Sequence, residues 1–285
     1  VNSKIKIGRK LNLKINNDNE DDTSQYFSLG VKLFSNTFNK IKPDLLMILG
    51  DRYEIYSAAV AACFNRVPIA HIHGGEKTEG AIDEALRHSI TKLSHIHFVS
   101  TKEHFNRVKQ LGENKKYILN VGSLGVESLK KIQFLNKKKI EKRLKIKFLK
   151  KKILITYHSE TLQSRSQNKK NIITILNSLK KLTDTTLIFT MPGADSNFKT
   201  ITKEIKKFVK KNKNSFLFKS LGDELYYSLC NQVDFMLGNS SSGIIEMPSY
   251  KKGTINIGNR QNGRIKAKSI IDVDYNEKKI KSKIN

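Results

Sequence analysis

The chain has 285 residues, a formal net charge of +27 and two cysteines. This length favours two domains of roughly 130–150 residues each, and two distant cysteines exclude a disulfide framework or a cysteine-rich metal cluster. No run approaches the roughly 18 uncharged apolar residues that cross a bilayer, and no cleavable signal pattern opens the chain, so we expect a soluble, cytoplasmic protein with no membrane partner.

The positive charge is weak evidence for nucleic-acid binding. Only nine of the 53 basic residues are arginine, the residue favoured for bidentate contacts to phosphates and bases. Lysine runs such as Lys137–Lys139, Lys150–Lys152 and Lys206–Lys211 fall on predicted polar helix faces and linkers, where charge runs are usually solvated. We therefore expect no nucleic-acid partner; a groove that uses these lysines to bind nucleic acid is the alternative.

Apolar runs of strand length alternate with longer segments of helical period, which is the pattern of parallel sheets built from βαβ units. The acidic, Asn-rich opening from Asn16 to Ser24 is predicted to be a loop before the first helix. The predicted strands are Leu45–Leu49, Ile69–Ile72, His97–Val99, Ile153–Thr156, Leu187–Thr190, Phe216–Phe218, Phe235–Leu237 and Thr254–Ile257. The predicted helices are Tyr53–Asn65, Ile82–Lys92, Lys102–Leu111, Asn168–Lys181, Phe198–Lys211, Leu221–Asn231 and Ser242–Ser249. This order predicts a doubly wound α/β architecture.

The segment from about Asn136 to Lys152 is predicted to connect the two domains. It is rich in lysine, has helical character and contains few bulky apolar residues and no strand. The predicted domains are therefore residues 1–149 and 150–285.

The first candidate site is Gly50-Asp51-Arg52-Tyr53-Glu54, which follows the first predicted strand directly. In open parallel sheets, ligands bind outside the carboxyl ends of the strands. Asp51 is thus a candidate catalytic residue, although Asp is also a preferred N-cap of a helix, which is the alternative.

The second candidate site follows the next strand, in the run His71-Ile72-His73-Gly74-Gly75-Glu76-Lys77-Thr78, and continues into Asp83, Glu84, Arg87 and His88. Two neighbouring strand ends would thus present carboxylates and imidazoles to one crevice, and the two glycines let the backbone pass close to a ligand. His71 and His73 supply no third metal ligand at a fixed spacing, so no metal is expected. The charged residues from Asp83 onward could alternatively be the exposed first turns of a helix.

The third candidate is His158, in the run Tyr157-His158-Ser159-Glu160-Thr161 after the strand Ile153–Thr156. A histidine after a strand is often only a hydrogen-bonded structural residue. Its place at a strand end, in a second domain that faces the first, makes a ligand contact equally plausible.

The fourth candidate is Gly238-Asn239-Ser240-Ser241-Ser242-Gly243-Ile244-Ile245-Glu246. Small polar residues at the start of a helix expose backbone N–H groups, so a phosphate or diphosphate would fit there. Glu246 could accept hydrogen bonds from ribose hydroxyls. A serine N-cap with a glutamate in a capping box is the alternative, but it explains only one serine and one glutamate. No Walker loop and no G-x-G-x-x-G signature is present.

Together these motifs resemble the hydrolysing branch of the UDP-N-acetylglucosamine 2-epimerases, especially the members in sialic-acid and legionaminic-acid pathways. The resemblance extends from about Pro43 to about Val273, and its most specific runs are LGDRYE, HIHGGEKT, DEALRHSITKLSHIHF, GNSSSGIIEMPS and TINIGNRQNGR. It implies two Rossmann-like domains with parallel sheets, as in GT-B glycosyltransferases, with the active site in the interdomain cleft, and usually a homodimer.

The resemblance also implies the chemistry. UDP leaves C1–C2 of the sugar by anti elimination, and water then adds to the glycal with inversion at C2, giving N-acetylmannosamine without any cofactor. Such a reaction needs a positioned base and charge stabilisation for the departing UDP. The family's catalytic acids correspond to Asp51 and Asp83, and its second-domain histidine corresponds to His158. The residues that the resemblance assigns to UDP are Ser240, Ser241, Ser242, Gly243, Glu246 and Arg260.

Two features depart from the family pattern. Relatives carry a glutamate where this chain has His73, so either His73 or the nearby Glu76 takes that acid/base role. Nothing before Pro43 resembles the family's opening strand and its Gly-Ser/Thr-Arg loop, and the usual C-terminal helices would follow Asn285. We therefore expect a chain that is truncated at both ends.

Two alternatives share the expected nucleotide site. One is the same reaction on UDP-2,4-diacetamido-2,4,6-trideoxyglucose, because the residues that would contact the sugar cannot be told apart in the sequence. The other is a GT-B glycosyltransferase, which would need an acceptor before it released UDP.

Overall fold

The structure is a computed structural model that describes residues 7–13, 20–193 and 195–285. It divides into two compact units. The first unit comprises Val1–Thr78 with Ile82–Ser123, and the second comprises Glu79–Ala81 with Leu124–Asn285.

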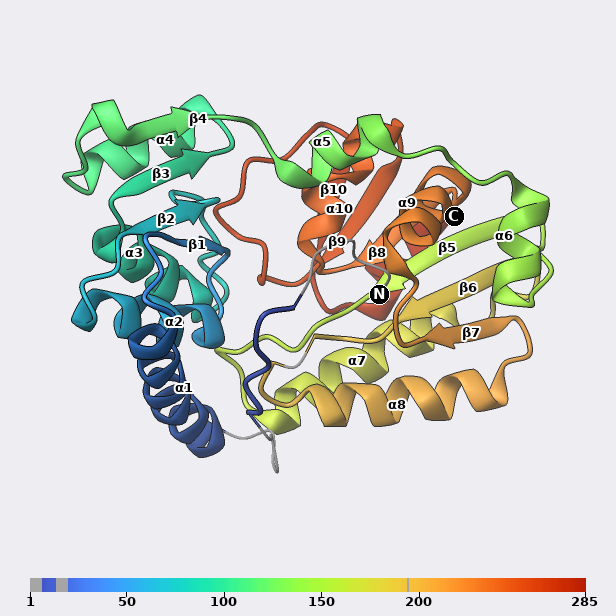
Figure 1. The fold of residues 1–285 in the computed structure, drawn as a ribbon. Helices are drawn as coiled ribbons and strands as arrows, with labels where there is room; N and C mark the ends of the chain where they lie inside the picture. Colours follow the sequence, from blue (N-terminus) through green and yellow to red (C-terminus); the bar gives the residue numbers. More distant parts are fainter. Residues whose placement is uncertain (1–6, 14–19, 194) are drawn as a thin grey trace. The chain divides into compact units, whose positions relative to one another are not determined.

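The described residues of the first unit alternate helices with short strands (Figure 1). In chain order they form α1 (Glu20–Ile41), β1 (Leu46–Leu49), α2 (Tyr53–Phe64), β2 (Ile69–Ile72), α3 (Asp83–Leu93), β3 (Ile96–Val99), α4 (Lys102–Gln110), a 3₁₀ turn (Lys115–Tyr117) and β4 (Ile118–Asn120). The strands form a parallel sheet in the order β1-β2-β3-β4. Because the order in space is the order in sequence, the carboxyl ends of β1, β2 and β3 lie next to one another along one edge of the sheet.

The core of the first unit lies between its sheet and α2. Alanines of α2, including Ala59 and Ala62, are fully buried against Ile48 and Ile69 of the sheet. Small side chains allow the helix to lie close to the strands. Helix α1 packs on α2 through apolar residues at helical spacing, among them Phe38. The elements around the site are thus held by ordinary helix-on-sheet packing.

The second unit contains more strands than the first, and helices pack on both faces of its sheet. In chain order the elements are α5 (Leu124–Lys131), α6 (Lys137–Leu144), β5 (Lys151–Thr156), α7 (Arg165–Leu179), β6 (Thr185–Thr190), α8 (Phe198–Lys211), β7 (Ser215–Phe218), α9 (Gly222–Gln232), β8 (Phe235–Gly238), α10 (Ser241–Ile245), a 3₁₀ turn (Met247–Tyr250), β9 (Gly253–Ile257), β10 (Ile270–Val273) and α11 (Glu277–Ile284). The strands are parallel in the order β10-β9-β8-β5-β6-β7.

Two buried clusters lie on opposite faces of this second sheet. Alternate residues of β5 divide between them: Ile153 and Ile155 pack with α7 and α8, which run together below the sheet in Figure 1, while Leu154 packs with α6 and α9. The chain runs from β5 outward to β7 and then returns to place β8 on the other side of β5. The gap between β5 and β8 is therefore the topological switch point, where ligands of such folds bind.

The prediction of an α/β protein with two parallel sheets is confirmed, and each predicted strand and helix is present with ends shifted by a few residues. Within the described residues, the strands and α-helices that were not predicted are β4, β10, α5 and α11, and the 3₁₀ turn Lys115–Tyr117 was not predicted either. The loop predicted from Asn16 to Ser24 is wrong for residues 20–24, which begin α1; residues 16–19 lie outside the described part of the chain.

The predicted domain boundary near residue 150 also needs correction, because the structure divides after Ser123. Ile140 and Leu144 of α6 are buried in the same cluster as Leu229 of α9. The lysines that suggested a linker occupy the outer face of α6, and the apolar stripe beneath them anchors the helix to the second unit.

Candidate functional site

The candidate residues of the first unit lie just after the carboxyl ends of three strands. The first residues beyond these ends are Gly50 after β1, His73 after β2 and Ser100 after β3. Gly50 adopts φ of +92° and His73 adopts φ of +67°, so both strands end in a left-handed turn. Such a conformation is uncommon for a residue with a side chain, and at His73 it redirects the imidazole at the point where the strand stops.

Arg87 of α3 is the centre of an ionic network in the first unit. Its guanidinium donates to the Asp51 carboxylate through Nη2 and to Glu84 Oε2 through Nη1, over 2.9 Å in the second case. It also donates to Thr78 Oγ1 at 2.6 Å and to the Glu76 carbonyl at 2.9 Å. Arg87 is only 1% exposed, so a buried cation joins residues that follow β1 and β2.

Glu84 holds its charge within this network. Burial alone would raise the pKa of its carboxyl, but hydrogen bonds from His88 and from the Thr78 N–H, together with the charge of Arg87, lower the pKa to about 2. Glu84 is therefore ionised at neutral pH, and its contacts with Arg87 and with the Thr78 N–H hold the loop between β2 and α3 in place.

His73 and Glu76 form a close imidazole–carboxylate pair. His73 Nδ1 lies 2.6 Å from Glu76 Oε1, and both side chains are largely buried. An ionised carboxylate only accepts hydrogen bonds, so His73 Nδ1 carries the proton of this bond. The neutral ring then has its lone pair on Nε2, which is the arrangement that makes a histidine a general base.

His71 is a structural residue. It is fully buried; Nε2 lies 3.0 Å from the Gly50 carbonyl and Nδ1 lies 3.3 Å from Thr91 Oγ1. Burial lowers the pKa of His71 to about 4, so the ring is neutral at pH 7. It connects the ends of β1 and β2 below the candidate catalytic residues.

The structure decides between some of the alternatives for this region. The N-cap of α2 is Arg52, so Asp51 is not the cap and instead pairs with Arg87. Burial of Arg87 contradicts an exposed first turn of α3 at that position. Asp83 begins α3 and is partly buried, and the contacts to Arg87 and Thr78 come from its neighbour Glu84.

In the second unit, Asn239 organises the switch point between β5 and β8. Its side chain accepts from the His158 N–H at 2.7 Å and donates to the His158 carbonyl at 2.9 Å. Its own carbonyl accepts from Gln261 Nε2 at 2.8 Å. Asn239 and Gln261 are fully buried, so one amide residue joins the segments that follow β5, β8 and β9.

The imidazole of His158 is held in one tautomer. The Gly193 N–H donates to His158 Nδ1 at 3.0 Å, so Nδ1 is the acceptor and the neutral ring carries its proton on Nε2. His158 is half-buried and would therefore offer a hydrogen-bond donor to a ligand at the switch point.

The serine run after β8 contains both a cap and candidate donors. Ser240 is the N-cap of α10 and accepts from the Ser242 N–H at 3.3 Å, which confirms the N-cap alternative for that serine. Tyr226 donates to Ser242 Oγ at 2.8 Å, so the Ser242 hydroxyl keeps its own proton for donation. A Cβ on Gly243 would lie 2.8 Å from Thr254 Cγ2, so this turn packs tightly on β9.

Glu246 does not form a capping box with Ser240, because it is the C-cap of α10. It is half-buried, and a Cβ on Gly125 would lie 2.3 Å from its Oε1. Gly125 of α5 therefore leaves space for the Glu246 carboxylate, and a residue with a side chain at that position would clash with it.

Arg260 lies in the loop after β9. Its Nη1 lies 3.4 Å from the Asn239 carbonyl and its Nη2 lies 3.5 Å from Asp195 Oδ2, both long contacts. Its Nε is buried without a hydrogen-bond partner. Arg260 and His158 therefore both contact Asn239. The contacts of Arg260 with the protein are long, so they hold its guanidinium donors only weakly.

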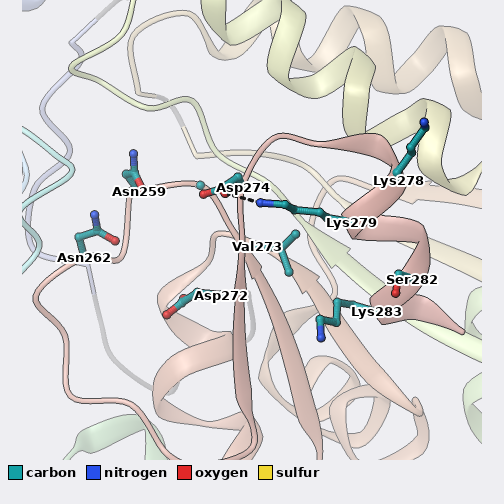
Figure 2. A pocket seen from close by; sticks show the side chains of 10 residues that line it. Asn259, Asn262, Asp272, Val273, Asp274, Lys278, Lys279, Ser282 and Lys283 are labelled. Carbon is teal, nitrogen blue, oxygen red and sulfur yellow. Dashed lines mark hydrogen bonds and ion pairs between the residues drawn. The ribbon is translucent and has the colours of Figure 1, made fainter.

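A separate surface pocket of about 460 Å³ lies beside β10 and α11 (Figure 2). Its charged lining residues include Asp272, Asp274 and Lys279, and the last two form an ion pair of 3.2 Å. None of the candidate site residues above lines this pocket. It is therefore distinct from the switch-point residues.

The part of the chain that the structure describes contains no group of three or more His, Cys, Asp or Glu that could hold a metal ion. None of the helices in residues 7–13, 20–193 and 195–285 has the length and apolar composition needed to span a bilayer.

Four residues of these networks were not predicted as site residues from the sequence: Arg87, Glu84, Asn239 and Gln261. The spacing of Glu84 and Arg87, three apart on one helix face, was the available signal, but their burial cannot be read from spacing. Asn239 stood next to the candidate serines, and only the contacts across β5, β8 and β9 identify it as an organiser.

Comparisons with known proteins show which family the chain resembles. The protein-family model described as UDP-N-acetylglucosamine 2-epimerase matches residues 1–285. The chain is 42% identical to a GDP/UDP-N,N'-diacetylbacillosamine 2-epimerase (hydrolyzing) of Campylobacter jejuni, over 97% of this chain and 72% of the relative. It is 38% identical to the polysialic acid biosynthesis protein P7 of Escherichia coli, over 98% of this chain and 71% of the relative.

The fold is similar to that of a UDP-GlcNAc 2-epimerase from Neisseria meningitidis whose crystal structure contains UDP-GlcNAc. The TM-score is 0.79 at 21% identity, over 98% of this chain and 76% of that chain. At that identity the similarity concerns the fold alone.

Proposed function

Because this chain belongs to the UDP-N-acetylglucosamine 2-epimerase family, we propose that it is a hydrolysing 2-epimerase that converts UDP-N-acetylglucosamine and water into UDP and N-acetylmannosamine. A base removes the C2 proton, the C1–O bond breaks, and UDP leaves with the electron pair. Water then supplies a hydroxyl to C1 and a proton to the opposite face of C2. No oxidant or reductant is needed.

The observation that carries this proposal is the 2.6 Å contact between His73 and Glu76. The family resemblance implies a glutamate in relatives where this chain has His73. The base could therefore be either His73 or Glu76. The pairing favours His73: Glu76 orients the ring and stabilises the imidazolium, and His73 Nε2 takes the proton. Asp51 and Asp83 are the proposed acids for the proton that returns to C2.

The second unit is proposed to hold and stabilise the leaving UDP. His158 offers an Nε2–H donor, Ser242 offers its hydroxyl, and Arg260 brings a positive charge. Donors aimed at the diphosphate lower the barrier because negative charge develops there as the C1–O bond breaks. Ser240, Ser241 and Gly243 belong to the same proposed diphosphate turn, and Glu246 is proposed to accept from the ribose hydroxyls.

A second candidate substrate is supported by the names of two relatives. Proteins of Campylobacter jejuni and Legionella pneumophila, at 42% and 32% identity, are named as hydrolysing 2-epimerases of N,N'-diacetylbacillosamine nucleotides. A relative from Neisseria meningitidis, at 31% identity, is named UDP-N-acetylglucosamine 2-epimerase. The same elimination would proceed on either sugar, because the additional acetamido group lies away from C1 and C2.

The test is an incubation of the chain in D₂O with each UDP-sugar and no acceptor, followed by NMR. Elimination and hydration predict UDP, the 2-epimerised free sugar and one deuterium at C2, because the C2 proton comes from solvent. Simple cleavage of the glycosidic bond would leave hydrogen at C2 and the configuration unchanged.

Two controls make the outcome specific. His73→Asn should lose both UDP release and deuterium exchange at C2 if His73 is the base. UDP release that requires an added acceptor would instead indicate a glycosyltransferase and contradict the proposal.

The homodimer expected from the sequence remains a prediction, which sedimentation velocity of the same preparation would test.

A further inference from the structure

The hydrogen bonds around Glu76 continue to two side chains that the proposed reaction does not use. Ser100 Oγ donates to Glu76 Oε1 over 3.3 Å, and His104 Nδ1 lies 2.9 Å from Ser100 Oγ. Glu76 and His104 are buried, at 5% and 8% exposure. A continuous chain of four polar side chains therefore runs from His73 into the protein.

The chemistry of the carboxylate orders the protons along this chain. Glu76 can only accept when ionised, so the single Ser100 proton points to Glu76. Ser100 Oγ must then accept from His104, and the proton of the His104 ring must lie on Nδ1. One consistent set of directions results: His104 donates to Ser100, Ser100 donates to Glu76, and Glu76 also accepts from His73.

The inner end of the chain is built on a rigid element. His104 lies in the first turn of α4, where Thr101 caps the helix by accepting from the His104 N–H at 3.1 Å. The turn that carries His73 and Glu76 lies directly on this helix: a Cβ on Gly75 would lie 2.5 Å from the His104 carbonyl. Arg107, one turn later, donates to the Gly75 carbonyl. The start of α4 and the His73 turn therefore cannot move independently.

We propose that Ser100 and His104 are positioning residues that fix the Nδ1–H tautomer and the orientation of His73 through Glu76. With two donors on Oε1, the Glu76 carboxylate has one preferred rotamer, and that rotamer directs His73. The left-handed backbone at His73 makes this support necessary, because its side-chain direction is not set by a strand or a helix. The inference deepens the proposed function, since it rests on His73 acting as the base.

The effect on turnover follows from this geometry. A base that samples two orientations is in place for only part of the time, and small misplacements reduce the rate strongly. Ser100→Ala should lower kcat about tenfold while KM changes little, because the serine does not touch the substrate. Ser100→Thr retains the hydroxyl and should retain most of kcat.

His104 has its own matched pair of variants. His104→Asn keeps an N–H donor near the position of Nδ1 and should remain close to the parent protein. His104→Phe removes the donor and should resemble Ser100→Ala. Ser89→Ala serves as the control for a lost hydroxyl, because Ser89 on α3 bonds only to the Ala85 carbonyl within its own helix.

Histidine NMR tests the inference separately from the activity. In protein labelled with ¹⁵N-histidine, the parent chain should show His73 and His104 as Nδ1–H tautomers. Ser100→Ala should shift the signals of both rings and leave His97, which pairs with Glu113, unchanged. Substituting each histidine in turn assigns the signals.

The outcomes are distinguishable. Unchanged His73 signals in Ser100→Ala would overturn the inference, and so would altered signals with unaltered kcat. A parent chain that releases no UDP from either sugar would refute the proposed function. In that case the spectra still decide whether Ser100 and His104 fix the tautomer of His73.

Discussion

The candidate site residues of the two units are held by different kinds of interaction. In the first unit, a buried guanidinium binds two carboxylates, and an imidazole binds a third. In the second unit, the switch point is held by amide groups: Asn239 bonds His158 on both sides of its backbone and accepts from Gln261. The first arrangement is ionic. The second is built on the neutral amides of Asn239 and Gln261, and the charged Arg260 joins it only through long contacts.

This difference matches what each unit is proposed to do. Acid/base chemistry requires charged groups whose protonation is controlled by their neighbours. Binding of a diphosphate requires donors that are in place before the ligand arrives, and a neutral scaffold provides them without competing for the negative charge. We therefore expect charge substitutions and pH to act mainly on the first unit, and shape or acceptor changes to act mainly on UDP binding.

The largest expected effect is that of Arg87→Met. Removal of the buried guanidinium leaves Asp51 and Glu84 without their cation, and breaking such a pair costs roughly 3–5 kcal/mol. Peptides of the first unit should exchange their amide hydrogens faster than in the parent chain. An activity assay should detect no turnover. Arg143→Met is the matched control, because Arg143 and Glu224 are each half exposed; it should cost less than about 1 kcal/mol. Equal losses in the two variants would contradict the ionic description of the first unit.

The next effect is that of Asp51→Asn on catalysis. An amide cannot act as an acid or base, so kcat should fall by about 10²–10⁴. Stability should fall by only about 1–2 kcal/mol, since the amide oxygen can still accept from Arg87 and Arg87 keeps Glu84. Measurement of kcat together with urea unfolding separates the two. A large loss of stability with retained activity would assign Asp51 a purely structural role.

The pH dependence of the first unit should reflect His71. Its pKa is about 4 in the folded protein and its ordinary value is 6.5, so the unfolded chain binds the proton more readily between these values. The stability that this neutral ring contributes is complete above pH 6.5 and decreases by about 3 kcal/mol as the pH falls to 4.

Urea unfolding of the parent chain and of His71→Gln at pH 7, 5.5 and 4 measures this dependence. The variant should lose less stability than the parent over the same range. If the two chains respond to pH in parallel, acid sensitivity has another origin.

The smallest effect concerns the second unit. Glu246→Ala should weaken UDP binding about tenfold, which corresponds to one hydrogen-bonded acceptor. Glu246→Gln keeps an acceptor and should lose less, and Arg87→Lys in the first unit should leave UDP affinity unchanged. Titration calorimetry with UDP at one pH measures all three. Unaltered affinity in Glu246→Ala would remove this residue from the nucleotide site.

The elements that could be predicted share one property, a strong local pattern. Phe235–Leu237 is a continuous apolar run and Ile69–Ile72 is apolar except for His71, and each is a strand buried inside its sheet. The two missed strands lie at sheet edges: β4 has only three residues and exposes Leu119, and β10 exposes Ile271. An edge strand buries less surface, so selection for an apolar run is weaker there.

The positions of the site residues could be predicted, but their roles could not. Asp51, His73 and His158 were recognisable because each follows a strand-like run, and loops at such ends carry ligands. The open choice between His73 and Glu76 depended on an orientation set by a left-handed backbone. Whether Asp51 caps a helix or joins an ionic network depended on Arg87, which lies 36 residues further along the chain.

The sequence by itself thus determined the order of the elements and the polar residues at their ends, because hydrophobic runs and helical periods are local properties of the chain. Only the tertiary structure decided which charges are buried and what they contact. Arg87 became the ionic centre of one unit and Asn239 the neutral centre of the other, 81 residues from its partner His158. Burial and long-range hydrogen bonds arise when separate segments pack together, and no local pattern records them.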